Sequence, residues 1–62
     1  MQVVRVVKYK GFVYRVLRHP LGFYLIQKKI KVMDWRFTRD WYGPEIFFYR
    51  KNAIKKILMY IL

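Results

Sequence analysis

The sequence predicts an α+β domain, in which a small antiparallel β-sheet of three to five strands carries one C-terminal α-helix packed on one face. Two observations predict it. Up to about residue 50, runs rich in valine and aromatic residues alternate with turns that contain glycine or proline, as in antiparallel hairpins. Beyond residue 52, the apolar residues recur with helical spacing. A chain of 62 residues allows a single domain, 1–62.

Glycine and proline mark the turns of this sheet. Lys10-Gly11 separates Val3–Tyr9 from Phe12–Arg18, two runs rich in valine and tyrosine that predict a pair of strands. His19-Pro20-Leu21-Gly22 predicts the next turn, because proline fixes φ and the glycine can adopt a positive φ. Phe23–Lys28 is then the third strand.

The middle of the chain leaves one connection open. The cluster Lys28-Lys29-Ile30-Lys31 is either a loop or part of one long strand with a bulge. Beyond it, alternation predicts a strand that ends at Tyr42-Gly43-Pro44. Its two faces carry Met33, Trp35 and Phe37 on one side and Asp34, Arg36 and Thr38 on the other. We interpret Trp35 and Phe37 as core residues in preference to platforms for base stacking.

The C-terminal residues change to helical periodicity. A short apolar run, Ile46–Tyr49, predicts a final edge strand before them. The predicted helix has an apolar stripe of Ala53, Ile54, Ile57, Leu58 and Ile61. Asn52 is the best available N-cap. Such a short helix depends on packing against the sheet for its stability.

The predicted strands are apolar on both faces, whereas one short helix covers only part of one face. In the second strand, for example, Tyr14 and Val16 oppose Val13 and Leu17. We therefore expect an exposed apolar surface, which commonly marks a docking site for a partner or for a second copy of the chain.

The residue types argue against an enzyme. The chain has no cysteine or serine, and Thr38 is its one threonine, so the usual nucleophiles are scarce. His19 lies in a predicted turn, where a solvated role is the more common one. We interpret the acids as ion-pair partners of the many cations, for example Asp34 with Arg36 or Arg39. One histidine and three scattered carboxylates match no metal-binding spacing, so we expect no catalytic residue, metal or cofactor.

The hydrophobic segments are too short for a membrane span. The longest stretch without a charged residue, His19–Gln27, is far below the ~18–20 residues that a span needs. Arg5 and Lys8 interrupt the N-terminal valines, unlike the apolar core of a signal peptide. We expect no membrane span and a cytoplasmic location.

Positive charge is the strongest feature of the sequence. Fourteen Lys and Arg against three Asp and Glu give a formal net charge of +11 at pH 7. A domain of this charge attracts polyanions, because neutralised phosphates release their counterions. The cations that we expect to contact nucleic acid or an acidic partner are Arg15, Lys28, Lys29, Lys31, Arg36, Arg39, Arg50, Lys51, Lys55 and Lys56. Arg50 and Lys51 adjoin the predicted helix N-terminus, where an anion site and simple solvation are equally good interpretations.

Aromatic residues interleave with cations between Trp35 and Tyr42. This mixture suits the stacking of unpaired bases beside backbone phosphates. Trp41 and Tyr42 lie in a predicted turn and are the aromatic candidates at the margin of the binding surface.

One stretch, Tyr14–Lys29, has the pattern Tyr-x-Val-x-x-His-Pro-x-Gly-x-Tyr-x-x-Gln-Lys-Lys and precedes an aromatic strand and Asn52-Ala53-Ile54-Lys55-Lys56-Ile57. In these features the chain resembles small uncharacterised proteins of bacteriophages and mobile elements, which have a β-hairpin sheet and a C-terminal helix. The resemblance implies a phage-type accessory protein that acts inside a bacterial cell by binding, and it assigns no functional residue. The helix here lacks the Thr or Asp cap and the glutamates that such proteins often carry, which leaves this end more basic.

Two functions follow from these observations with nearly equal weight. The first is a non-enzymatic basic module that binds nucleic acid or a nucleic-acid-handling complex. The second is a small viral inhibitor that docks on an acidic host protein, such as a polymerase, nuclease or defence factor. In the second, cations steer association and an exposed apolar sheet face supplies affinity. The choice between DNA and RNA, the identity of a host target and the oligomeric state stay open.

Overall fold

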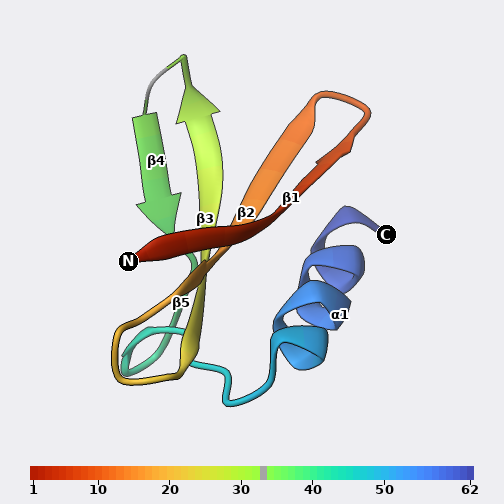
Figure 1. Ribbon diagram of the computed structural model, residues 1–62. Coiled ribbons are helices and arrows are strands. Elements are labelled where there is room, and N and C mark those ends of the chain that lie inside the picture. The colour runs from red at the N-terminus through yellow and green to blue at the C-terminus, as the bar shows by residue number, and fades with distance from the viewer. Residues whose placement is uncertain (33) are drawn as a thin grey trace.

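A four-stranded antiparallel meander and one helix form the fold, which confirms the predicted α+β class. The computed structural model describes residues 1–32 and 34–62, and of Lys31 the backbone alone. The strands are neighbours in chain order (Figure 1): β1 (Gln2–Tyr9), β2 (Phe12–Arg18), β3 (Tyr24–Lys31) and β4 (Asp34–Phe37). The helix, α1 (Arg50–Ile61), packs against β2 and β3. Met33, which the alternation pattern placed beside Trp35 and Phe37, lies outside the described residues.

The predicted turns form for the expected reasons. Lys10 and Gly11 have φ values of 46° and 84°, and positive φ at both positions gives the two-residue loop whose twist matches that of the flanking strands. Gly22 has a φ of 99°, and its N–H donates a hydrogen bond of 2.8 Å to the carbonyl of His19. In Figure 1 the two hairpins that these strands form, β1–β2 and β3–β4, splay apart, as strongly twisted strands do.

β3 is one long strand that continues through the basic cluster to Lys31. Lys29 pairs with Trp35 and Lys31 pairs with Asp34, with an irregularity in the register between them. The interpretation of this cluster as a loop was therefore wrong, and the alternative of a long strand with a bulge is confirmed. Pairing with β4 satisfies the backbone N–H and C=O groups of the cluster. Lysine side chains do not prevent this pairing.

Leu17 and Leu25 are buried on the face of the sheet away from α1, and the main core lies between α1 and the other face. Its buried side chains are Tyr14, Val16, Ile26, Ala53 and Ile57. Ile54 and Ile61 pack at its margin, but Leu58 is exposed, so the predicted apolar stripe is confirmed except at Leu58. Tyr60 contacts the sheet instead, with its ring stacked on Tyr14 at 6.0 Å between ring centroids.

Strand register assigns side chains to the other face, away from α1. Arg15 pairs with Gln27, Gln27 pairs with Phe37, and Lys29 pairs with Trp35. Directly paired residues of antiparallel strands share a face. Trp35 and Phe37 are half-buried on the face that α1 leaves uncovered. The prediction that they pack in the core was wrong, because alternation groups residues by face but does not say which face the helix covers.

The chain leaves the line of β4 after Thr38 and rejoins it at Phe47. The Thr38 N–H donates to the carbonyl of Ile26 at 3.0 Å, and the Glu45 N–H donates to the carbonyl of Thr38 at 2.9 Å. Phe47 and Tyr24 then exchange two backbone hydrogen bonds of 2.7 and 2.9 Å. This single bridge replaces the edge strand predicted over 46–49.

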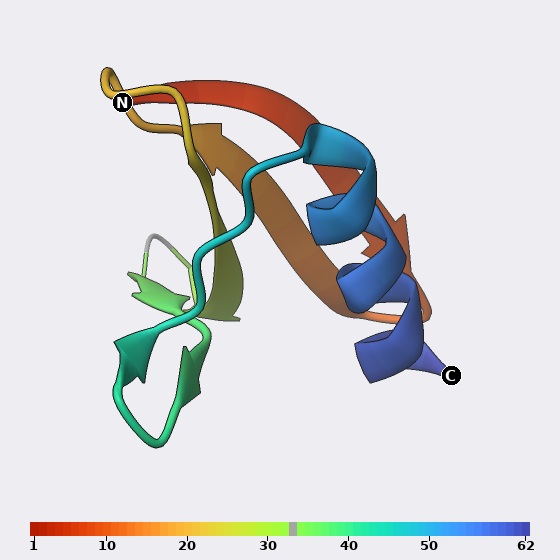
Figure 2. The same cartoon turned by 90° about the horizontal axis from the view of Figure 1, so that it is seen from below.

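Between Thr38 and Phe47 the chain forms a small hairpin. It consists of β5 (Arg39–Asp40) and β6 (Gly43–Pro44), which pair with each other and not with the main sheet. Figure 2 shows the hairpin standing out from the sheet, on the opposite side of the molecule from the first turn of α1. The predicted long strand therefore divides into β4 and β5 at Thr38.

α1 begins earlier than predicted. Its N-cap residue is Tyr49, no side chain caps it, and the first turn contains no acid. Asn52 lies inside the first turn, where its N–H donates to the carbonyl of Tyr49 at 3.1 Å. The prediction of Asn52 as N-cap was therefore wrong. Arg50 and Lys51 are in the helix but are polar. A helix predicted from its apolar stripe therefore does not include them.

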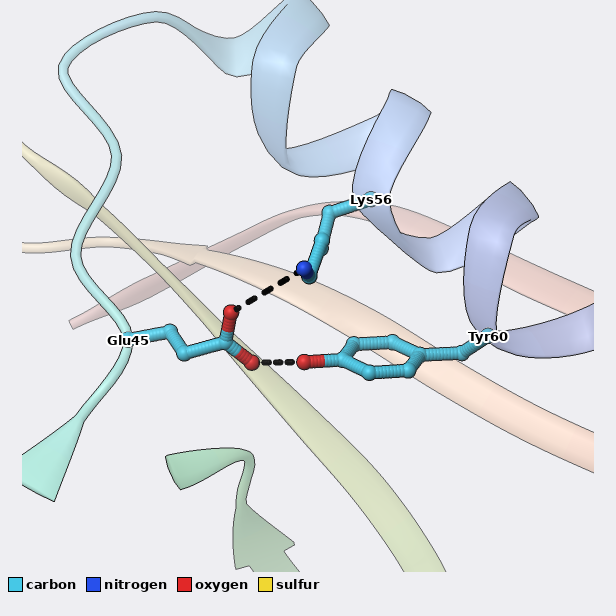
Figure 3. Close-up of polar contacts among 3 residues, drawn as sticks. All are labelled: Glu45, Lys56 and Tyr60. Carbon is cyan, nitrogen blue, oxygen red and sulfur yellow. Dashed lines mark hydrogen bonds and ion pairs between the residues drawn. The ribbon is translucent and has the colours of Figure 1, made fainter. Parts of the chain in front are cut away.

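Glu45, in the segment between Thr38 and Phe47, contacts α1 (Figure 3). Tyr60 donates a hydrogen bond to its carboxylate, and the Lys56 ammonium lies 4.0 Å from its second oxygen. Among the described side chains this is the one ion pair within 4.0 Å, so the predicted pairs of Asp34 with Arg36 or Arg39 do not form. Asp34 and Arg36 are two residues apart on an extended strand, about 7 Å along the chain.

Candidate functional site

The predicted contact residues separate into two groups in space. One group lies on β4, the sheet face away from α1 and the small hairpin: Arg15, Lys29, Arg36, Arg39, Trp41 and Tyr42. Arg36 pairs with Lys28, so its side chain starts from the helix face of β4 and borders this group at the sheet edge. The other lies on α1: Arg50, Lys51, Lys55 and Lys56. In Figures 1 and 2, α1 and β4 lie on opposite sides of the molecule, so the two groups form separate surfaces.

The first group surrounds an open depression of about 420 Å³, which we call the β4 groove. Its lining residues are Trp35, Arg36, Phe37, Arg39 and Pro44. It forms because the chain turns away from β3 at Thr38, so that the hairpin stands beside β4 without pairing with it. Two aromatic rings, a proline and two exposed arginines thus share one depression at the edge of the sheet.

Arg15 places a further positive charge beside the groove and is held there by two contacts. Its guanidinium lies 4.0 Å from the ring centroid of Trp35, a cation–π distance. Its Nε donates a hydrogen bond of 2.7 Å to the side-chain oxygen of buried Gln27. The Lys29 ammonium lies 5.9 Å from the same indole. Trp35 is therefore flanked by two cations, one of which has a fixed orientation.

The tip of the small hairpin exposes two aromatic residues. Trp41 and Tyr42 are 97% and 98% exposed, as their place in a predicted turn indicated. The Asp40 carboxylate shapes the turn by accepting hydrogen bonds from the N–H groups of Tyr42 (2.8 Å) and Gly43 (3.2 Å). The Asp40 carboxylate, the acid nearest to the two rings in the sequence, is therefore bonded within the turn. Both rings extend into solvent.

The cations on α1 are only partly available. Lys56 is held by Glu45 and lies 5.4 Å from the ring of Tyr60. Arg50, Lys51 and Lys55 are exposed around an uncapped helix N-terminus. They make a second positive surface on the helix, where the Lys51 ammonium lies 5.9 Å from the ring of exposed Tyr49.

The two remaining predicted residues lie outside both groups. Lys28 is on the helix face of the sheet, with its ammonium 5.6 Å from the ring of Phe12 and 6.0 Å from that of Tyr14. Lys31 ends β3, and its side chain is not described. Trp35 and Phe37 were predicted to be core residues, and Pro44 was predicted only as part of a turn. In the sequence, the one sign that Trp35 and Phe37 belong to the groove is that they alternate with arginines.

Other kinds of site find little support in residues 1–32 and 34–62. These residues contain no group of three or more His, Cys, Asp or Glu side chains arranged to hold a metal ion. His19 has a role in its turn: its Nδ1 accepts the Leu21 N–H at 3.1 Å, and its ring stacks on Phe23 at 4.3 Å. No helix in this part of the chain has the length and apolarity required to cross a membrane.

No family model matches the chain, and comparisons with curated proteins and with solved structures find no significant match.

Proposed function

We propose that this protein is a non-enzymatic basic module that binds nucleic acid, with the β4 groove and its flanking cations as the contact surface. The observation that carries the proposal is the placement of Arg15 and Arg39 beside half-buried aromatic rings at a sheet edge, which Arg36 borders from the helix face of β4. Guanidinium groups bind phosphate with paired hydrogen bonds, and aromatic rings beside them contact the nucleotides between phosphates. A net charge of +11 supports association with a polyanion over the whole surface.

A charge-reversal pair tests whether the groove is the contact surface. Arg36→Glu with Arg39→Glu reverses two exposed cations of the groove. Arg5→Glu with Lys8→Glu is the matched control, because it changes the net charge equally at exposed positions of β1, the opposite edge strand of the sheet. Fluorescence anisotropy with labelled DNA and RNA at several salt concentrations measures the affinity of each variant.

We expect wild-type affinity to fall steeply with salt, because each neutralised phosphate contributes about one unit to the slope of log K against log salt. The groove variant loses more affinity than the β1 variant and has a shallower slope. Equal losses in the two variants contradict the groove as the site. No binding of any DNA or RNA at ~50 mM salt, where phosphate contacts are strong, contradicts the function itself.

A second candidate function is a phage-type inhibitor that docks on an acidic protein inside a host bacterium. The observation in its favour is that Val3 and Val6 remain about half exposed, at 44% and 48%. They pair with Leu17 and Arg15, on the face away from α1. Docking through this apolar surface keeps most of its affinity in high salt and loses mainly association rate. This candidate is favoured over nucleic acid if a stoichiometric protein partner stays bound after nuclease treatment and in high salt. The same partner is lost in the variant Val3→Lys with Val6→Lys.

A further inference from the structure

We propose that the β4 groove and the tip of the small hairpin bind single-stranded nucleic acid, with unpaired bases stacked on Trp41 and Tyr42 and held against the groove. This inference rests on the proposed function and adds the form of the nucleic acid. It requires aromatic surfaces that a base can cover, cations on the same hairpin and the adjoining strand, and a site that suits an unpaired strand better than a duplex.

The first requirement is met at the hairpin tip. Trp41 and Tyr42 have almost their whole side chains in water, although large aromatic rings gain strongly from burial. Neither ring packs in the fold. The Asp40 carboxylate stabilises the turn that carries them through two backbone hydrogen bonds. Two adjacent rings on an ordered turn can each take one base, and stacking accepts any base because every base has a π face.

The second requirement is met by the groove that adjoins the tip. Arg39 begins the hairpin strand that leads to Trp41, and Arg36 precedes it on β4. Both arginines are exposed and line the depression with Trp35, Phe37 and Pro44. Its volume of about 420 Å³ lies in the range of small-molecule sites, so it can receive a planar base. Arg15, fixed over Trp35, adds positive charge at the inner side.

The third requirement separates single strands from duplexes. In a duplex the faces of the bases are stacked on one another, so the aromatic rings of the tip have nothing to stack on. Duplex binding then uses cations alone, and it occurs on either basic surface of this protein. A single strand uses the cations and the rings together, as in other non-specific binders that combine a positive groove with aromatic platforms.

The test compares single-stranded with duplex oligonucleotides of about 12 nucleotides, within the site sizes of ~4–16 that small single-strand-binding domains cover. Trp41→Ala with Tyr42→Ala removes the rings. Both side chains are exposed, so the variant retains the fold, which circular dichroism verifies. Leu21→Ala with Phe48→Ala is the matched control, because it shortens two exposed apolar side chains outside the groove and its hairpin.

We expect the tip variant to bind single strands about ten-fold or more weakly, since it loses two base stacks and each contributes about five-fold or more in comparable sites. Its duplex affinity and its salt slope stay unchanged, because the phosphate contacts remain. The Leu21 and Phe48 control binds as wild type does. By contrast, Arg36→Glu with Arg39→Glu lowers both affinities and the slope.

The outcomes distinguish this inference from the proposed function. If wild type binds duplex as tightly as single strands, or if the tip variant keeps full single-strand affinity, nucleic-acid binding stands and the stacking site is wrong. If neither form binds at low salt, the proposed function fails with it. A protein partner lost in the tip variant but insensitive to nuclease also overturns the stacking site.

Discussion

Tyr60 in α1 donates a hydrogen bond to the carboxylate of Glu45, which directly follows the small hairpin and also faces Lys56. The two residues are 15 positions apart in the chain, and their contact joins the helix to the segment that carries the β4 groove. Glu45 is one of only three acids in a chain of net charge +11, so it also offsets local repulsion among the cations.

Removing this contact is expected to destabilise the fold moderately. Tyr60→Phe lowers the free energy of unfolding by about 0.5–1.5 kcal/mol, the usual net contribution of one hydrogen bond at a partly exposed site. Glu45→Gln keeps an acceptor but loses the charge that faces Lys56. Urea unfolding of both single variants and of the double variant gives a coupling energy, and a value near zero contradicts the link. Tyr42→Phe, at a 98% exposed tyrosine, is the control.

The Arg15 contact with Trp35 and Gln27 predicts a second stability effect. Arg15→Ala removes a cation–π contact and leaves the buried Gln27 side chain without its partner, at a combined cost of about 1–3 kcal/mol. Arg15→Lys recovers only part of this, because an ammonium does not stack as a planar guanidinium does. Urea unfolding with Arg5→Ala as the exposed control measures the difference. Equal midpoints for the Arg15 and Arg5 variants contradict the prediction.

Tyr14 predicts a loss of stability at high pH. Burial raises the pKa of its hydroxyl above the ordinary value of 10.0. Below about pH 10 the hydroxyl is protonated in both states and has no effect, whereas above it the unfolded chain loses this proton first, so stability falls. In urea unfolding between about pH 8 and pH 11, Tyr14→Phe has a shallower decline than wild type. Tyr9→Phe, at an exposed tyrosine of β1, keeps the wild-type decline, and the same decline in Tyr14→Phe refutes the assignment.

Thr38 offers a substitution that is expected to be neutral or stabilising. Its hydroxyl oxygen is buried and, among the described atoms, has no hydrogen-bond partner. Thr38→Val replaces the hydroxyl with a methyl group of similar size and changes stability by between zero and about +1 kcal/mol, because an unsatisfied buried polar group is costly. Thr38→Ser keeps the hydroxyl and loses a methyl group, so it destabilises by about 1 kcal/mol. Thermal unfolding compares them, and a marked loss in Thr38→Val reveals a partner for the hydroxyl.

Local signals located the turns and the class of the fold. Lys10-Gly11 and His19-Pro20-Leu21-Gly22 form turns because their backbone preferences act over two to four residues, whatever lies around them. The end of the strand at Thr38 and the beginning of α1 at Arg50 were not foreseen. Both depend on contacts with distant residues, Ile26 in the first case and the packing of the helix on β2 and β3 in the second.

Turn chemistry, alternation and charge are properties of neighbouring residues, so they were enough to predict a highly basic antiparallel sheet with one C-terminal helix. The sheet face that α1 covers follows instead from long-range packing. Trp35 and Phe37 alternate as core residues do, and the register with β3 places them on the uncovered face with Arg15. That choice rests on where the chain re-enters at Phe47 to start the helix, a long-range contact that no local pattern encodes.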